Sequence, residues 1–267
     1  MARLLLFGWV LLSLAGCGSQ QAVRLTLTGS TSMTPFVEHL AETYQHDHAG
    51  TAIDVQGLGS SAGIRAAAEG ISELGMSSRA LEADEADELE QIVMARDALT
   101  VIVHPSSPVR ELTRDQIRGI FAGVITSWDE VGGQTRPIVI ISREAGSGTY
   151  SAFEELVMKG EPLTMGALRQ GSNGAVRQIV ADDPDAIGYI SLGIVDASVQ
   201  AVAIDGVEPS VEQVEGGAYT LVRPFLIVWR KGHDLSPLAD AFLSYVRSPE
   251  GQAMLAHDGL VPGGGIQ

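Results

Sequence analysis

Short apolar runs alternate with amphipathic segments along the chain, and this alternation constrains the fold more than any other feature. Residues 98–105 (ALTVIVHP) and 136–142 (RPIVIIS) are nearly continuous apolar runs, typical of strands that are buried on both faces. Residues 34–44 instead repeat apolar side chains at helical spacing. Strands that alternate with helices build mainly parallel sheets with helices on both faces. The 267 residues suffice for one large α/β domain or two smaller ones.

Three of the predicted strands run directly into a Gly/Ser/Thr-rich turn that precedes a helix. These segments are residues 25–33 (LTLTGSTSM), 53–64 (IDVQGLGSSAGI) and 139–153 (VIISREAGSGTYSAF). Each turn would present unpaired backbone N–H groups, hydroxyls and the positive end of a helix dipole, which favour an anion. Each one alone is also an ordinary helix N-cap. Three together, at the carboxyl ends of strands where α/β proteins bind ligands, favour an anion-binding site.

Two arginines accompany these turns. Arg143 belongs to the third turn, and its planar fork can grip two oxygens of a tetrahedral oxyanion. Arg79 follows Ser78 in residues 73–81 (ELGMSSRAL), where a surface position is an equal alternative to a binding role. The formal net charge of −16 argues against nucleic acid and against an anionic membrane surface as partners. It does not oppose a small anion, because a few oriented donors outweigh distant, salt-screened charge.

The first residues form a targeting segment. A positive residue precedes an apolar stretch, residues 4–12, which is too short to span a bilayer comfortably. Residues 14–17 (LAGC) resemble the bacterial lipobox, in which Cys17 would carry the lipid (palmitate) and become the first mature residue. Cys17 is the only cysteine, so an intramolecular disulfide and a CxxC metal or redox motif are excluded. We predict a lipoprotein signal peptide at 1–16 and a tether at 17–22, with an ordinary signal peptide as the alternative.

These motifs together resemble the phosphate-binding proteins of bacterial ABC phosphate-uptake transporters. The resemblance covers nearly the whole mature chain in the expected order, and the pattern R-E-x-G-S-G-T is its most specific part. The matching segments are GSTSM (29–33), GLGSSAGI (57–64), GMSSR (75–79), LTRDQIRGIFAGVITSWDEVGG (112–133), SREAGSGT (142–149), AIGYIS (186–191) and YVRSPEGQAMLAHDGLVP (245–262).

The resemblance implies a two-lobed clamp of the type II periplasmic-binding-protein kind, which closes on one anion in the cleft between its lobes. Lobe one is expected at residues 23–100 and 225–267, and lobe two at 101–224. Two hinge strands, 99–105 and 223–231, would join them. The family binds inorganic phosphate without chemical turnover or cofactor and delivers it to the membrane subunits of an ABC permease. A monomer is expected, lipid-anchored outside the cytoplasm (periplasmic or on the outer cell surface).

The resemblance also implies a set of phosphate-binding residues. They are Thr31, Ser32, Ser60, Ser61, Ser78, Arg79, Arg143, Ser147, Gly148 and Thr149. Some relatives place an aspartate where this chain has Ser78, and use it to accept the proton of hydrogen phosphate. A serine oxygen, a backbone carbonyl or Glu144 is left to accept that proton here. Because donors alone do not reject sulfate, another tetrahedral oxyanion stays open as the ligand.

Other interpretations of the sequence stay open. Residues 59–63 (GSSAG) match G-x-S-x-G, in which Ser61 would be the nucleophile of a serine hydrolase, and His233 or His257 follow in the chain. No HGGG-type oxyanion motif accompanies this pattern. A sensing role in place of transport also fits a phosphate binder. The histidines of residues 46–48 (HDH) point apart on a helix, so we predict no metal site.

Overall fold

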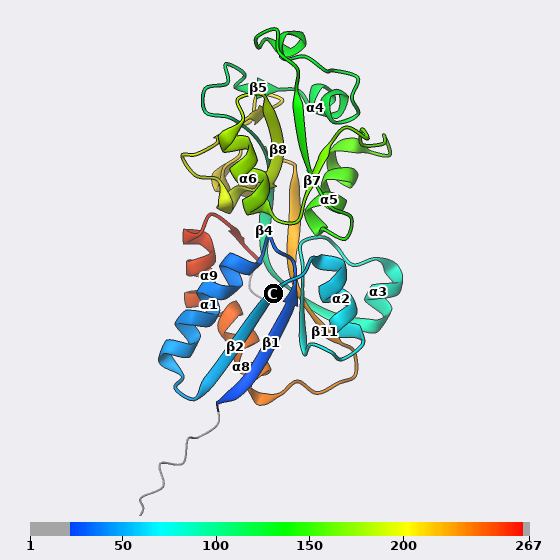
Figure 1. The fold of residues 1–267 in the computed structure, drawn as a ribbon. Coiled ribbons are helices and arrows are strands. Elements are labelled where there is room, and N and C mark those ends of the chain that lie inside the picture. The colour runs from blue at the N-terminus through cyan, green and yellow to red at the C-terminus, as the bar shows by residue number, and fades with distance from the viewer. Residues whose placement is uncertain (1–21, 264–267) are drawn as a thin grey trace, which may run out of the picture.

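A computed structural model describes residues 22–263 as an elongated α/β molecule whose two halves lie end to end (Figure 1). The predicted signal peptide, the lipidation site Cys17 and most of the predicted tether lie outside the described residues. Within residues 22–263, no helix is both long enough and apolar enough to cross a bilayer.

Strands and helices alternate along the chain, as the sequence pattern predicts. The strands are β1 (Val23–Gly29), β2 (Thr51–Gly57), β3 (Leu74–Ser77), β4 (Leu89–Val103), β5 (Glu111–Leu112), β6 (Val139–Arg143), β7 (Leu168–Gln170), β8 (Ala186–Ser191), β9 (Gln200–Ala201), β10 (Ala203–Ile204), β11 (Val222–Arg230) and β12 (Val261–Pro262). The α-helices are α1 (Thr34–Asp47), α2 (Ser60–Ala68), α3 (Ala83–Glu88), α4 (Arg114–Phe121), α5 (Gly148–Phe153), α6 (Asn173–Asp182), α7 (Val211–Glu215), α8 (Pro237–Arg247) and α9 (Pro249–His257). Shorter helical segments are η1 (Trp128–Val131), η2 (Glu154–Met158) and η3 (Leu192–Ile194).

The main sheet runs through both halves in the order β2-β1-β3-β11-β4-β8-β6-β7. Strands β1, β2 and β3 pair in parallel in one half, and β6 pairs in parallel with β7 and β8 in the other. The centre differs from the predicted mainly parallel sheet, because β11 is antiparallel to β3 and β4, and β4 is antiparallel to β8. The chain passes from the first half along β4 and returns along β11, so these two strands point in opposite directions.

Each half has its own apolar core, and β4 contributes to both. In the half that contains the N-terminal strand, α1, α8 and α9 cover one face of the sheet and α2 covers the other (Figure 1). In the other half α4 and α5 lie on one face and α6 on the opposite face. Ala95 of β4 belongs to the first core, and Leu99, four residues later, belongs to the second. The two halves are therefore joined by a continuous strand, although the predicted lobe boundaries stay a prediction.

Strand β4 begins well before the predicted position. The sequence pattern predicts a strand from residue 98, but the structure extends it back to Leu89. This earlier part mixes buried and exposed side chains, with Glu90 and Gln91 exposed, so it lacks the continuous apolar run that marks residues 98–105. The extra residues pair with β11, from Leu89 opposite Arg230 to Asp97 opposite Arg223. Long-range pairing, and not local hydrophobicity, makes this segment a strand.

Candidate anion-binding site

The three predicted turns meet where the two halves of the molecule touch. The turns after β1 and β2 lead into α1 and α2 in one half, and the turn after β6 leads into α5 in the other. The Ser32 hydroxyl lies 2.7 Å from the Thr149 hydroxyl, and both side chains are buried. The Ser61 backbone N–H donates to the Gly146 carbonyl at 3.2 Å. Three helix N-termini therefore converge on one buried cluster of hydroxyls.

The start of α5 needs a glycine to reach this cluster. A Cβ atom on Gly148 would lie 2.5 Å from the Ser78 hydroxyl oxygen and would also overlap the Ser60 hydroxyl oxygen. Ser147 precedes it as the N-cap of α5, and its hydroxyl accepts a hydrogen bond from the Tyr150 backbone N–H at 3.4 Å. Because residue 148 has no side chain, the amide end of α5 packs directly against hydroxyls of the opposite half.

Arg143 is the cation of the cluster. Its side chain is 1% exposed, and its Nε and Nη2 atoms donate to the carbonyls of Gln170 and Gly171 at 3.0 and 2.9 Å. Nη2 also donates to the Thr31 hydroxyl of the opposite half at 3.0 Å, and Nη1 to the Thr149 hydroxyl at 3.3 Å. Burial, and after it the nearby Arg223 cation, lowers the pKa of Arg143 to about 10. Arg143 is therefore still positively charged at neutral pH.

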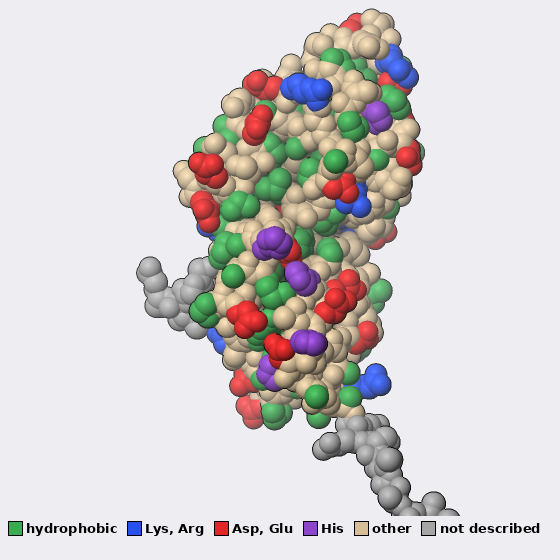
Figure 2. Space-filling model, turned by 90° about the vertical axis from the view of Figure 1, so that its left-hand side faces the viewer, with side chains coloured by type: hydrophobic (Ala, Val, Ile, Leu, Met, Phe, Trp, Pro, Cys, Tyr) green, Lys and Arg blue, Asp and Glu red, His purple; other side chains and the backbone are tan. Residues whose placement is uncertain are grey.

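This buried charge resolves the contrast between an anion site and an acidic chain. On the face shown in Figure 2, Asp and Glu side chains are spread over both halves, while Lys and Arg side chains are few. Negative charge on such a surface faces water and is screened by salt within about 10 Å. Arg143 and the helix N-termini act where water is excluded, so their interactions are stronger.

Ser78 lies in a network of hydroxyls. It accepts a hydrogen bond from the Ser30 hydroxyl at 2.9 Å and lies 3.3 Å from the Ser60 hydroxyl, while its own backbone N–H donates to the Ser60 oxygen at 3.0 Å. All three serines are buried. Hydroxyls donate and accept, so this network contains acceptors as well as donors. Glu144, considered above as a proton acceptor, is exposed.

The structure does not bring the Arg79 guanidinium into the cluster, which corrects its predicted binding role. Both Nη atoms donate to the Glu85 carboxylate at 2.7 Å, and Nη1 also donates to the Ala80 carbonyl at 2.8 Å. The hydrogen bond to Glu85 raises the pKa of Arg79. Glu85 belongs to helix α3, which has no buried residue, so a carboxylate six residues along the chain holds this arginine.

Sequence reasoning missed several buried polar residues near the site. Asn173, at the start of α6, is 1% exposed, and its side-chain oxygen and nitrogen have no hydrogen-bond partner among the described residues. Asp97 and Arg223 form a buried ion pair between β4 and β11. The available signal was a charge that borders or interrupts an apolar run, Asp97 in ARDALTVIV (95–103) and Arg223 in LVRPFLIVW (221–229).

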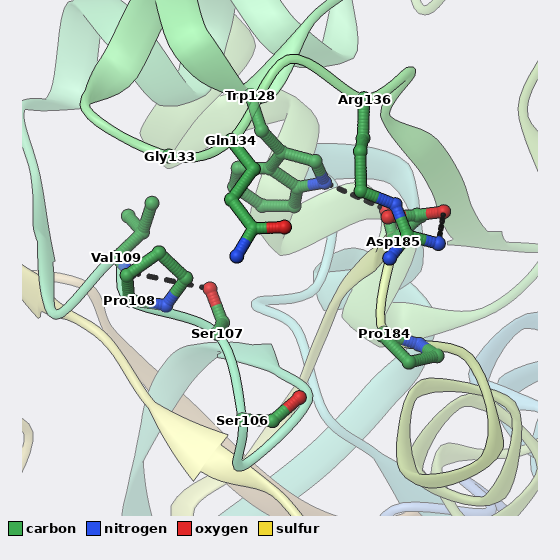
Figure 3. A pocket seen from close by; sticks show the side chains of 10 residues that line it. All are labelled: Ser106, Ser107, Pro108, Val109, Trp128, Gly133, Gln134, Arg136, Pro184 and Asp185. Atoms are coloured by element: carbon green, nitrogen blue, oxygen red, sulfur yellow. Dashed lines mark hydrogen bonds and ion pairs between the residues drawn. The ribbon is translucent and has the colours of Figure 1, made fainter.

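A hollow that shares no residue with the anion site lies in the half that contains α4 and α5. It holds about 260 Å³ and is lined by the loop after β4, by η1 and by the turn before β8 (Figure 3). Its charged groups, Arg136 and Asp185, pair with each other at 2.7 Å, and the Trp128 indole N–H donates to the Asp185 carbonyl at 3.0 Å. The two charges cancel, so this hollow offers an anion no uncompensated cation.

The hydrolase interpretation gains no support from the geometry. In the part of the chain that the structure describes, no histidine hydrogen-bonds to Ser61. A nucleophilic serine needs a base within hydrogen-bond reach.

Comparison with known proteins agrees with this fold and site. Residues 18–250 match the family model described as a PBP superfamily domain. The phosphate-binding protein PstS of Bacillus subtilis is 32% identical over 243 residues, which cover 89% of this chain and 80% of that protein. The phosphate-binding protein PstS of Pseudomonas aeruginosa strain PAO1 is 30% identical, over 89% of this chain and 82% of the relative.

Solved structures of similar fold agree with these sequence relatives. A putative phosphate ABC transporter substrate-binding protein with bound phosphate from Clostridium perfringens has a TM-score of 0.87 and 41% identity, and the match covers 90% of this chain and 99% of that chain. An ABC-type phosphate transport receptor from Vibrio cholerae has a TM-score of 0.74 and 34% identity, over 89% and 99% of the two chains. The fold and the buried cluster define a member of the PBP superfamily, which confirms the predicted type II clamp. Within that superfamily, the chain belongs to the family of the phosphate-binding proteins PstS.

Proposed function

We propose that this protein binds inorganic phosphate outside the cytoplasm and delivers it to an ABC permease, without chemical turnover. The observation that carries the proposal is Arg143, a buried guanidinium that contacts hydroxyls from both halves of the molecule. A desolvated cation beside helix N-termini stabilises a small oxyanion strongly, because little water competes for it. The relatives named above are a phosphate-binding protein and a putative phosphate ABC transporter substrate-binding protein with bound phosphate, which supports the proposal.

The proposed phosphate contacts come from all three turns and from the end of β3. They are Thr31, Ser32, Ser60, Ser61, Ser78, Arg143, Ser147, Gly148 and Thr149. Arg79 is left out because Glu85 holds its guanidinium. In this proposal the hydroxyls of Ser78 and Ser60 accept the proton of hydrogen phosphate, the task of an aspartate in some relatives.

The proposal also includes how the protein is held in place. Lipid on Cys17 would anchor a monomer to a bacterial cell membrane, with the N-terminal segment as signal peptide and tether. The membrane subunits of an ABC permease would then receive the phosphate from the anchored binder. Phosphate sensing and the binding of another tetrahedral oxyanion are the competing roles. Ester hydrolysis that is lost in a Ser61→Ala variant would instead support an enzyme.

Calorimetric titration tests the proposal directly. The protein is stripped of carried-over anion and titrated with phosphate and then with sulfate. Tight one-to-one phosphate binding with little sulfate binding is the expected result. Equal binding of both anions would assign the protein to tetrahedral oxyanions in general, and binding of neither would overturn the proposed function. An Arg136→Met variant, which removes a cation far from the site, should bind phosphate as the wild type does.

A further inference from the structure

A second buried arginine lies in the centre of the molecule, where β4 and β11 cross between the halves. Arg223 stands opposite Asp97 in the pairing of these strands, and its Nε atom donates to the Asp97 carboxylate at 2.9 Å. The Ser191 hydroxyl of β8 donates to the other carboxylate oxygen at 2.6 Å. Asp97 and Ser191 are fully buried, and Arg223 is 2% exposed. Three strands therefore fix the position of one guanidinium.

The Nη atoms of this guanidinium donate no hydrogen bond to any described residue. Neither Nη1 nor Nη2 of Arg223 has a hydrogen-bond partner among residues 22–263, although Nη2 lies 2.8 Å from an Asp97 oxygen without the alignment of a hydrogen bond. A buried donor without an acceptor is costly, and a charged one more so. Arg79 shows the contrast, because both of its Nη atoms have acceptors. A purely structural ion pair has no need of such free donors.

Strand register places Ser191, which holds this pair, at the level of Arg143 along the sheet. Strand β8 lies between β4 and β6, and Leu99 stands opposite Ser191 on one side of it. On the other side Ile140 pairs with Ile187, and continuing this parallel register sets Arg143 beside Ile190, one residue before Ser191. Neighbouring strands are about 4.8 Å apart. Arg143 and the Ser191–Asp97–Arg223 group therefore lie at the same level of the sheet.

The charges agree with this placement. Arg223 is, after burial, the main influence that lowers the pKa of Arg143, so the two cations are close enough to interact. Two like charges brought together in a buried region repel each other in the absence of a counter-ion. A doubly charged anion beside Arg143 relieves that repulsion more than a singly charged one.

We propose that Arg223, held in place by Asp97 and Ser191, is a second cation of the anion site and strengthens binding of the doubly charged phosphate. Its Nη1 donor, which has no acceptor among the described residues, can reach an oxyanion oxygen directly or through one ordered water. The inference rests on the proposed function. It adds to that function a residue which no Gly/Ser/Thr turn contributes.

The test compares the direction in which two substitutions change the phosphate affinity. Arg223→Met removes the cation and is expected to weaken phosphate binding roughly ten- to a hundredfold, the scale of one charged hydrogen bond. Asp97→Asn removes the counter-charge but keeps a side-chain oxygen that can accept the Arg223 Nε hydrogen bond, so it should tighten phosphate binding. Arg223→Lys keeps the charge and should restore most of the affinity lost in Arg223→Met. A merely structural pair would weaken binding in the same direction in both neutral variants, and that result would overturn the proposal.

A second measurement is made on the wild-type protein, and a variant is needed only to assign the signals. The side-chain N–H resonances of Arg223 in the wild-type protein, identified by their loss in Arg223→Lys, should shift when phosphate is added, whereas those of Arg136 should not. An Arg223 signal that is unmoved at saturating phosphate would overturn the inference. If the wild type binds neither phosphate nor sulfate, the proposed function fails. If it binds phosphate while Arg223 fails these tests, only the second cation is refuted.

Discussion

Replacing Arg143 with methionine should separate ligand binding from folding. In the ligand-free protein the change removes four hydrogen bonds, to the carbonyls of Gln170 and Gly171 and to the hydroxyls of Thr149 and Thr31, at about 1 kcal/mol each. It also removes the cost of holding a charge in the interior. The pKa of Arg143 falls to about 10 through burial and the Arg223 cation, which corresponds to roughly 3 kcal/mol. These effects oppose each other, so the free energy of unfolding should change by no more than about 2 kcal/mol.

Phosphate binding should respond far more strongly. The guanidinium fork presents Nη1 and Nη2 toward the hydroxyls of Thr149 and Thr31, where the proposed phosphate oxygens would lie. One lost charged hydrogen bond costs about 1.5–3 kcal/mol, so a fork that grips two oxygens is worth roughly 3–6 kcal/mol. That range corresponds to a rise in Kd of about two to four orders of magnitude. Arg143→Lys keeps a point charge without the fork and should fall between wild type and Arg143→Met.

Two measurements on the same samples check the reasoning. Calorimetry gives the Kd for phosphate, and urea unfolding without ligand gives the free energy of unfolding. Arg177→Met is the matched control, because it removes a cation of the same half that pairs with Asp196 at 2.8 Å. Wild-type phosphate affinity in Arg143→Met would refute the site. Loss of both folding and binding would show that Arg143 is needed for structure, and the energetic argument above would then be wrong.

Three further predictions concern selectivity, closure and pH. Ser78→Asp should raise the preference for phosphate over sulfate, because a carboxylate accepts the proton of hydrogen phosphate and repels sulfate. Competition titrations of Ser78→Asp and of the uncharged control Ser78→Asn check this. Equal sulfate binding by both variants would contradict it. Gly148→Ala should weaken phosphate binding severely, because its Cβ would overlap the Ser78 and Ser60 hydroxyls. The control Gly174→Ala, whose Cβ would have only a distant contact, should bind phosphate normally. A wild-type Kd in both variants would disprove the need for close approach at residue 148. Phosphate affinity should hold up to a pH of about 10 and fall roughly tenfold per pH unit above it. The bound anion stabilises protonated Arg143, whereas the free protein releases that proton at its lowered pKa. A Kd that stays constant above this pH would argue against an arginine contact.

Much of the fold and of the site follows from local patterns in the sequence. The apolar run at 98–105, the helical spacing at 34–44 and the Gly/Ser/Thr turns after the strands each lie within a few residues, and the structure has a strand, a helix and helix N-termini there. Turn chemistry and hydrophobic period are local properties, so a single sequence reveals them. The carboxyl-end rule for α/β sheets then predicts that such turns gather at one place.

Only the tertiary structure decided which charged residues belong to the anion-binding site. Arg79 and Arg143 both follow a serine near the carboxyl end of a strand, but Glu85 pairs with Arg79 while Arg143 contacts Thr31, 112 positions away. Asp97 and Arg223, 126 positions apart, become partners only because β4 and β11 run side by side. The sequence by itself determined the α/β class, the helix N-termini and the anion chemistry, since these arise from neighbouring residues. The closed contact between the halves and the buried pair beside it depend on strand order and register, which local periodicity does not encode.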